Sequence, residues 1–113
     1  MCSQSDLKAI VARLQNALGS LFPGQCFDVI LFGSYARNDA DEGSDVDLLF
    51  LVDAPREMIL EKNWQVGEAA ADILMDYGVV VSPIVENREY FRTHEQGIPF
   101  FHSIAREGVR VDA

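Results

Sequence analysis

Hydrophobic residues recur along the chain with helical spacing in some segments and in short continuous runs in others. Residues 6–18 place their hydrophobic side chains on one helical face, which predicts a first helix with Ser3 or Ser5 as its N-cap. Short, mostly hydrophobic runs predict three strands, at residues 27–32, 45–52 and 79–85. Glycine, proline and acidic residues separate these runs, as expected of loops.

The second half of the chain is predicted to be mainly helical. Pro55 suits the first turn of a long helix over residues 56–77, and Gly78 suits its end. Asn87 can cap a short helix that continues to residue 93. A further helix is expected at residues 99–107, with Phe100 and Phe101 covering one end of the sheet, before a last short strand at 109–111.

This order of elements predicts the fold class α/β (α+β), with a small mixed β-sheet. The first two strands are joined by a short connection containing a helical turn at residues 35–39, so we expect them to be antiparallel. The second and third strands are joined by the long helix, so we expect them to be parallel. Helices should pack mainly on one face of this sheet. A chain of 113 residues predicts a single domain, 1–113.

The composition is that of an acidic globular protein. Hydrophobic residues make up 49% of the chain, which is enough for a core, and 18 acidic residues against 9 basic ones give a net charge of −9. Direct binding to nucleic acid is therefore not expected, because phosphate backbones are bound by Lys and Arg. The charge fits a metal-dependent site, a basic protein partner, or solubility alone.

The sequence indicates a cytoplasmic protein. No apolar run approaches the roughly 20 residues that span a bilayer, and the N-terminal residues lack the basic and hydrophobic regions of a signal peptide. Cys2 and Cys26 form neither a disulfide framework nor a metal-ligand spacing. We expect no membrane association.

Asp45 and Asp47 are the first candidates for chemistry. They lie two residues apart at the start of a predicted strand, so both side chains should point to one face, with their Cα atoms about 7 Å apart. Two close carboxylates repel unless a cation shares them. Hard ions with oxygen ligands are the usual partners, so the pair predicts Mg²⁺ or Mn²⁺ rather than zinc. A lone pair of this kind is more often a solvated strand end.

Gly33 and Ser34 are the second candidates. A glycine at the end of a strand lets the backbone approach a ligand closely, and Ser34 adds a hydroxyl. The amides that follow can begin a helix whose N-terminus favours phosphate. If the first two strands are antiparallel neighbours, this turn ends beside Asp45, and the phosphate and metal sites lie together.

The combined pattern resembles a known superfamily. Gly33-Ser34, ten intervening residues and then Asp45-Val46-Asp47 is similar to the motif of the DNA polymerase β nucleotidyltransferases. The surrounding residues, Gly-Ser-Tyr-Ala-Arg at 33–37 and Gly-Ser-Asp-Val-Asp-Leu-Leu at 43–49, resemble the minimal nucleotidyltransferase (MNT) domains of that superfamily. The resemblance implies a polymerase β-like fold over nearly the whole chain.

The resemblance also implies roles for individual residues. Asp45 and Asp47 are expected to hold Mg²⁺ and to act in catalysis, while Gly33 and Ser34 contact the phosphates of a nucleoside triphosphate, most simply ATP. Arg37 is expected to add a charged contact to the phosphates, although pairing with Asp39 or Asp41 explains it equally well.

One departure from the family concerns its third carboxylate. In the family this acid comes from the strand parallel to the second one, whereas the corresponding strand here contains Ser82 and no acid until Glu86. Asp76 and Glu86 flank the strand and are weak candidates to replace it. Nucleotide binding with slow or partner-dependent transfer is the expectation.

Two classes of function follow. The first is an enzyme that moves a nucleoside monophosphate from a triphosphate to a hydroxyl of a partner protein or small molecule. The second is an antitoxin: the resemblance to MNT proteins implies a HEPN-domain RNase toxin as partner, neutralised by binding alone, with a homodimer as the alternative association. Larger relatives carry an acceptor-binding domain, so for this chain we expect another protein or a second copy of the chain to supply the acceptor.

Overall fold

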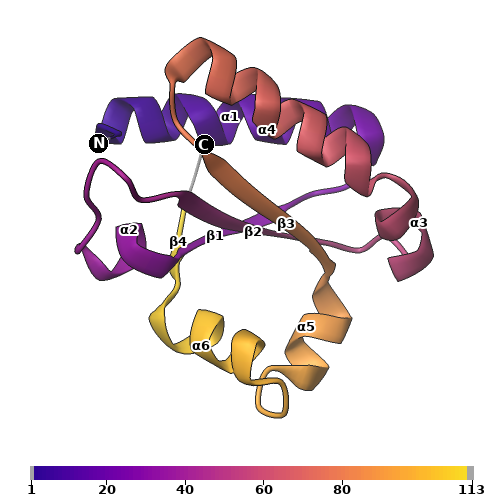
Figure 1. The fold of residues 1–113 in the computed structure, drawn as a ribbon. Coiled ribbons are helices and arrows are strands. Elements are labelled where there is room, and N and C mark those ends of the chain that lie inside the picture. The colour runs from indigo at the N-terminus through magenta and orange to yellow at the C-terminus, as the bar shows by residue number, and fades with distance from the viewer. Residues whose placement is uncertain (1, 112–113) are drawn as a thin grey trace.

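The computed structural model describes residues 2–111, which form six helices and four strands (Figure 1). In chain order the elements are α1 (Gln4–Leu21), β1 (Asp28–Phe32), α2 (Gly33–Arg37), β2 (Val46–Val52), α3 (Arg56–Glu61), α4 (Asn63–Tyr77), β3 (Val81–Asn87), α5 (Arg88–His94), α6 (Pro99–Glu107) and β4 (Val109–Arg110). This order agrees with the prediction except in the segment that follows β2.

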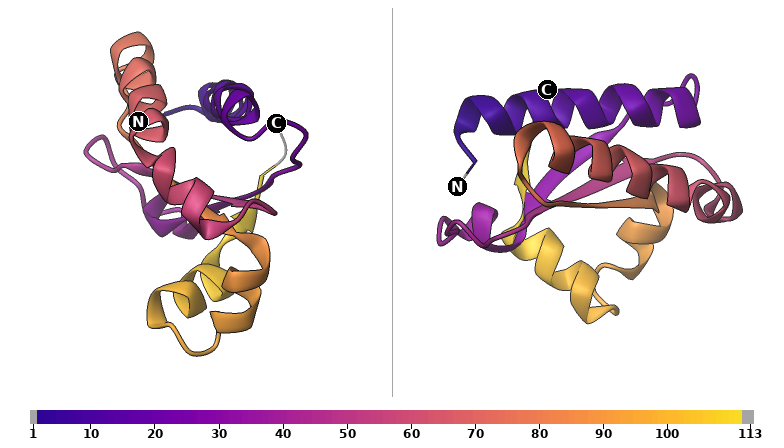
Figure 2. Two further views of the ribbon diagram at one scale, coloured as in Figure 1. Left: turned by 90° about the vertical axis from the view of Figure 1, so that its right-hand side faces the viewer. Right: turned by 45° about the horizontal axis from the view of Figure 1, so that its top comes forward.

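The four strands form one mixed sheet in the order β3-β2-β1-β4. β1 is antiparallel to both β2 and β4, whereas β2 and β3 are parallel, as the short and long connections predict. The two views in Figure 2 show α1 and α4 on one side of the sheet and α5 and α6 on the other. The mixed α/β class is confirmed.

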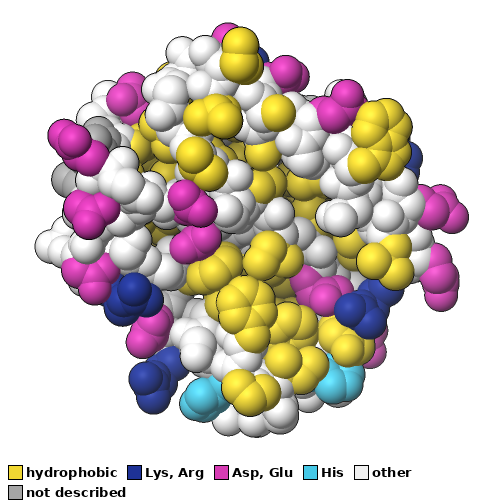
Figure 3. All heavy atoms as spheres, viewed as in Figure 1, with side chains coloured by type: hydrophobic (Ala, Val, Ile, Leu, Met, Phe, Trp, Pro, Cys, Tyr) yellow, Lys and Arg dark blue, Asp and Glu magenta, His cyan; other side chains and the backbone are white. Residues whose placement is uncertain are grey.

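Helices cover both faces of the sheet. The two longest, α1 and α4, lie on one face, as expected from a fold with helices mainly on one side (Figure 1). The shorter α5 and α6 form a second layer on the opposite face, which the sequence pattern did not predict. Hydrophobic side chains gather between these two helices and the sheet in the same view (Figure 3).

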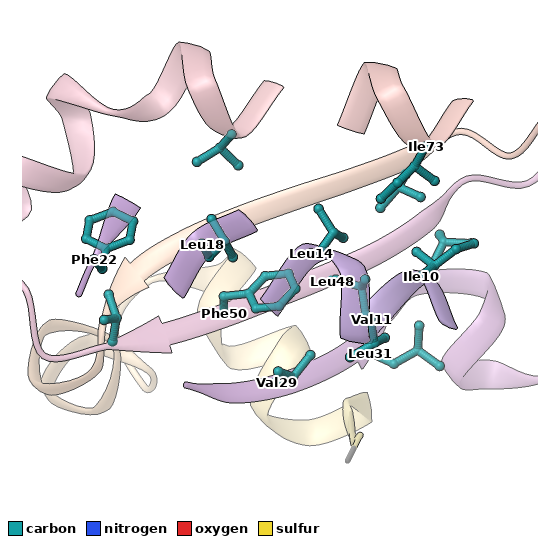
Figure 4. Packing of buried hydrophobic residues seen from close by; sticks show 14 of the residues in the cluster. Ile10, Val11, Leu14, Leu18, Phe22, Val29, Leu31, Leu48, Phe50 and Ile73 are labelled. Carbon is teal, nitrogen blue, oxygen red and sulfur yellow. The ribbon is translucent and has the colours of Figure 1, made fainter. Parts of the chain in front are cut away.

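The larger core lies between α1, α4 and the sheet. Leu14 and Leu18 of α1 lie over Leu48 and Phe50 of β2, and all four side chains are fully buried (Figure 4). A smaller cluster lies on the other face, formed by Leu49, Leu51, Phe91, Phe101 and Ile104. The central strand β2 is therefore buried on both faces, which explains its nearly continuous hydrophobic sequence.

Local capping decides where the helices begin. Of the two candidate N-caps of α1, Ser3 is the one used: its Oγ accepts a hydrogen bond of 3.1 Å from the Asp6 N–H. Asn87 caps α5 as predicted, with its Oδ1 accepting from the Tyr90 N–H at 2.9 Å. The sequence rules for helix starts therefore hold at both positions.

The predicted single helix over residues 56–77 is wrong, because the chain breaks at Lys62 into α3 and α4. Lys62 has φ −99° and ψ 4°, outside helical values, although its N–H still bonds to the Ile59 carbonyl at 3.2 Å. The two pieces are held by different partners. Arg56 ties α3 to Glu86 at the end of β3 through an Nε–Oε2 pair of 3.1 Å, while α4 packs along α1.

The edge strand β3 starts two residues later than predicted and carries Pro83 at its centre. The Val46 N–H donates to the Val80 carbonyl at 2.9 Å, so the polar backbone groups of residue 80 point toward β2. The backbone N–H and C=O groups of successive residues point to alternate sides of a strand. Those of Ser82 therefore point toward β2, and the backbone of Pro83 faces the outer edge. The missing N–H of Pro83 therefore costs the sheet no internal hydrogen bond.

An arginine cluster around Asp28 ties the second helical layer to the sheet. The Arg88 Nε donates to Asp28 Oδ2 at 2.7 Å, and Arg110 of β4 pairs with the other carboxylate oxygen. Arg88 also donates to the carbonyls of Cys26 at 3.1 Å and Leu51 at 3.2 Å. The hydrogen bond from Arg88 is the main cause that lowers the pKa of Asp28, against the opposing effect of burial.

We expect Asp28→Asn to lower the free energy of unfolding by about 2 kcal/mol at pH 7, because Arg88 loses its charged partner. The pKa of Asp28 is lowered in the folded state, so its stabilisation is present above the ordinary carboxyl pKa and is lost as the pH falls through the lower value. Urea titrations should therefore show the two proteins converging below about pH 4.

Asp53→Asn is the matched control for this prediction. The Asp53 side chain also pairs with Arg88 but is 67% exposed, so its loss should cost less than about 1 kcal/mol. Equal losses in the two variants would contradict the assignment of Asp28 as the main anchor.

Candidate active site

The turn between β1 and α2 forms one wall of the candidate site. Phe32 is still extended, with φ −135°, and Gly33 then turns the chain with φ +73° into a helix that begins at Gly33, earlier than the helical turn predicted at residues 35–39. Only glycine adopts this left-handed conformation without steric cost. α2 ends after one turn because Asn38 is also left-handed, with φ 63°.

Gly33 is also in close contact with Asp47 of the neighbouring strand. Phe32 is the register partner of Asp47, so the turn lies directly beside the start of β2. A Cβ atom on Gly33 would lie 2.2 Å from Asp47 Oδ2 and 3.1 Å from its Cγ. Glycine is therefore required for the backbone angle, and any other residue would also force the Asp47 carboxylate to move.

Asp47 lies on the face of the sheet that α5 and α6 cover. Side chains alternate along β2, and Leu49 and Leu51 belong to the smaller core on that face, so Asp47 projects the same way. Asp45 lines a different hollow, together with Tyr35 and Tyr77. Asp45 is exposed just before β2, whereas Asp47 is half-buried. Acidic side chains are visible at the start of β2 in Figure 3.

The electrostatics of Asp47 reflect this crowding. Burial is the main cause that raises its pKa, and the negative charge of Asp45 raises it further, while Arg37 acts in the opposite direction. The charge of Asp45 therefore destabilises the charged form of Asp47. One divalent cation shared by both and by ligand phosphates would remove this repulsion, and Mg²⁺ is commonly held by one or two carboxylates in this way.

A hollow of about 430 Å³ lies in front of Asp47. Its strand side is formed by the turn residues Phe32, Gly33 and Ser34 together with Arg37 and Asp47. Its other side is one face of α6, formed by Phe100, Ser103, Ile104 and Glu107. The structure thus brings four of the five predicted site residues to one hollow, while Asp45, whose charge acts on Asp47, lines a different one.

The α6 side of the hollow was missed by the sequence analysis. The residues at positions 100, 103, 104 and 107 follow the spacing of one helical face, which was the available signal. The spacing does not indicate which face of the sheet the helix packs against. That choice depends on the path of the chain after β3.

Arg37 lies between two acidic side chains. Its Nε donates to Asp39 Oδ2 at 3.3 Å, and its guanidinium lies 3.6 Å from Glu107 Oε2 of α6. Arg37 is exposed, so both pairs are weak and exchange readily with solvent. Pairing with Asp39, one of the two partners considered from the sequence, is therefore present, and the guanidinium also borders the hollow.

Neither substitute for the third carboxylate lies at the site. Ser82 is the register partner of Asp47 in the parallel pair, so the strand position next to Asp47 holds a hydroxyl. Glu86 is four residues further along β3, buried, and bonded to Arg56 and to the Asn87 N–H. Asp76 pairs with Arg13 of α1. Within residues 2–111, no group of three Asp, Glu, His or Cys side chains could hold a metal ion.

Comparisons with known proteins agree with this geometry. The profile of the family described as "Nucleotidyltransferase domain" matches residues 11–104, from α1 to α6. The chain belongs to this nucleotidyltransferase family. It is therefore a transferase of nucleotidyl groups, and its mixed sheet is consistent with the nucleotidyltransferase fold.

Two relatives come from Methanocaldococcus jannaschii. An 81-residue segment is 40% identical to "Putative protein adenylyltransferase MJ0604", covering 72% of this chain and 74% of that protein. The corresponding match to "Putative protein adenylyltransferase MJ0141" is 36% identical over 81 residues, covering 71% and 79%.

A third relative is much larger. A segment of 55 residues is 42% identical to the "Bifunctional glutamine synthetase adenylyltransferase/adenylyl-removing enzyme" of Xanthomonas campestris pv. campestris, covering 49% of this chain and 6% of that protein.

None of the helices in the described part of the nucleotidyltransferase chain combines the length and hydrophobicity that a bilayer crossing requires.

We expect Gly33→Ala to lower the free energy of unfolding by about 3 kcal/mol, from left-handed strain plus the clash with the Asp47 carboxylate. In an Asp47→Ala background the carboxylate is absent and only the strain remains, so the same change should cost about 1 kcal/mol. Denaturant unfolding of the four proteins measures this coupling. Equal costs in both backgrounds would show that Asp47 does not occupy the space beside Gly33.

Proposed function

We propose that this nucleotidyltransferase moves adenosine monophosphate from ATP to a hydroxyl group of a partner protein. The observation that carries the proposal is the contact of the Gly33-Ser34 turn with Asp47 at the wall of one hollow, because it joins the turn that would bind phosphate to a carboxylate that would bind the metal ion. The names of the two M. jannaschii relatives, as protein adenylyltransferases, support ATP and a protein acceptor.

The proposed reaction balances without a covalent intermediate on the enzyme. The acceptor oxygen bonds to the α-phosphorus of ATP, the bond from that phosphorus to the bridging oxygen breaks, and pyrophosphate leaves with the electron pair. The hydroxyl proton passes to water or to a base of the acceptor, because Ser82 cannot take it.

The residues of the hollow have separate proposed tasks. The Ser34 hydroxyl and the first amides of α2 bind the terminal phosphates, and Arg37 exchanges its exposed acidic partners for a phosphate. Asp45 and Asp47 would hold Mg²⁺ or Mn²⁺ together with the phosphates. Such an ion neutralises phosphate charge and orients the triphosphate.

Changing both carboxylates tests this proposal directly. We expect Asp45→Asn with Asp47→Asn to abolish Mn²⁺-dependent binding of ATP, measured by calorimetry. The metal-free double variant should be more stable than the wild type at pH 7, because burial and the charge of Asp45 raise the pKa of Asp47 and make its negative charge unfavourable in the folded state. Unchanged ATP affinity in the folded double variant would refute the proposed site.

The hydroxyl at position 82 leads us to propose slow transfer by the isolated chain. General-base assistance is worth roughly 10²–10⁴-fold in rate. We expect Ser82→Asp to raise transfer of labelled AMP by about 10²-fold, because it places an acid beside Asp47. Ser82→Asn, of similar size and uncharged, is the control, and a rate gain in both variants would contradict the explanation by a missing acid.

We propose a second candidate function, the neutralisation of a toxin by binding, with a HEPN-type RNase as partner. The net charge of −9 favours a basic partner, and hydrophobic side chains are exposed on α3 and α4, with Leu60 72%, Trp64 66% and Met75 83% exposed. Co-expression separates the two functions. Neutralisation that survives loss of both Asp45 and Asp47 works by binding, and neutralisation that disappears with them depends on the nucleotide site.

A further inference from the structure

The first turn of α6 carries two aromatic residues in different environments. Phe101 is buried in the smaller core, 8% exposed, which agrees with the expectation that it covers the sheet. Phe100 is 48% exposed and does not follow that expectation. It is one of the residues that line the hollow in front of Asp47.

The position of Phe100 is defined by Phe32. The two ring centroids are 5.7 Å apart, with the ring planes 80° to each other. Phe32 is in turn the register partner of Asp47 and the residue before Gly33. A half-exposed ring therefore borders the same hollow as the carboxylate and the proposed phosphate-binding turn.

The hollow has two chemically different ends along α6. Phe100 and Glu107 lie on one helical face, and seven residues of helix separate them by about 10 Å. Glu107 lies beside Arg37, at the end proposed for phosphate. The aromatic ring and the Arg37 guanidinium thus lie toward opposite ends of the hollow, so a triphosphate held by Arg37 can extend its base toward Phe100.

We propose that Phe100 is the stacking platform for the nucleobase of the triphosphate, an inference that rests on the proposed nucleotide site. Stacking on an aromatic side chain is worth roughly 1–3 kcal/mol per base in single-stranded nucleic acid binding, which is about 5- to 150-fold in affinity. Stacking increases with the area of the base, so the platform favours ATP and GTP over CTP and UTP.

The decisive experiment compares two ligands that differ in whether they carry a base. Calorimetry with Mn²⁺ measures the affinity for ATP and for inorganic tripolyphosphate in the wild type, Phe100→Leu and Phe100→Tyr. Leucine keeps most of the packing against Phe32 without an aromatic face, and tyrosine keeps the face. Trp64→Leu, at an exposed aromatic side chain on α4 that does not line the hollow, is the matched control.

We expect Phe100→Leu to weaken ATP binding about tenfold and to leave tripolyphosphate binding unchanged, while Phe100→Tyr and Trp64→Leu match the wild type. Urea unfolding of each variant establishes that it is folded. A folded Phe100→Leu protein that binds ATP as tightly as the wild type overturns the inference and leaves the phosphate site standing. A wild type that binds neither ligand overturns the proposed nucleotide site and the inference with it.

Discussion

The contact between Gly33 and Asp47 is the constraint on which the rest of the site depends. The carboxylate of β2 occupies the space that any side chain at the end of β1 would need. The same glycine turns the backbone with φ +73°, so that α2 begins immediately beside that carboxylate. The direction of α2, the position of Arg37 and the opening of the hollow all follow from this one crowded junction between two antiparallel strands.

The order of elements could be predicted because each part of the chain shows one period clearly. The strands β1 and β2 and the caps Ser3 and Asn87 depend on local chemistry that a sequence displays. The break at Lys62 could not be predicted in this way, since hydrophobic residues continue with helical spacing across it. The first of the two helices is also held by the ion pair from Arg56 to Glu86, which joins residues 30 apart in sequence and is invisible to a local pattern.

The strand side of the hollow was predictable because its residues are also close together in the sequence. The Gly33-Ser34 turn and the pair Asp45 and Asp47 lie within 15 residues of one another, and strand pairing alone brings them together. The α6 wall requires the chain to cross to the second face after β3, where Arg88 of α5 bonds to Asp28 of β1. Sequence separation of 60 residues hides such a contact from any local pattern.

Ser82 lies beside Asp47, at a strand position where a further negative charge would be unfavourable for folding. Asp47 already has a raised pKa because it is partly buried near Asp45. A third acid at the adjacent strand position would add negative charge with no basic residue on β3 to offset it. A hydroxyl there keeps the apo domain free of this repulsion, and the proton acceptor of the proposed reaction then has to come from outside the strand.

The proline on the outer edge of β3 has a consequence for how the protein meets others. Exposed sheet edges are the usual templates for strand addition and for the aggregation that follows from it. A strand added beside β3 would find no N–H donor at Pro83, in the middle of the edge, and would lose a rung of its ladder there. Sheet extension at this edge is thereby weakened, which protects the domain against polymerisation along β3.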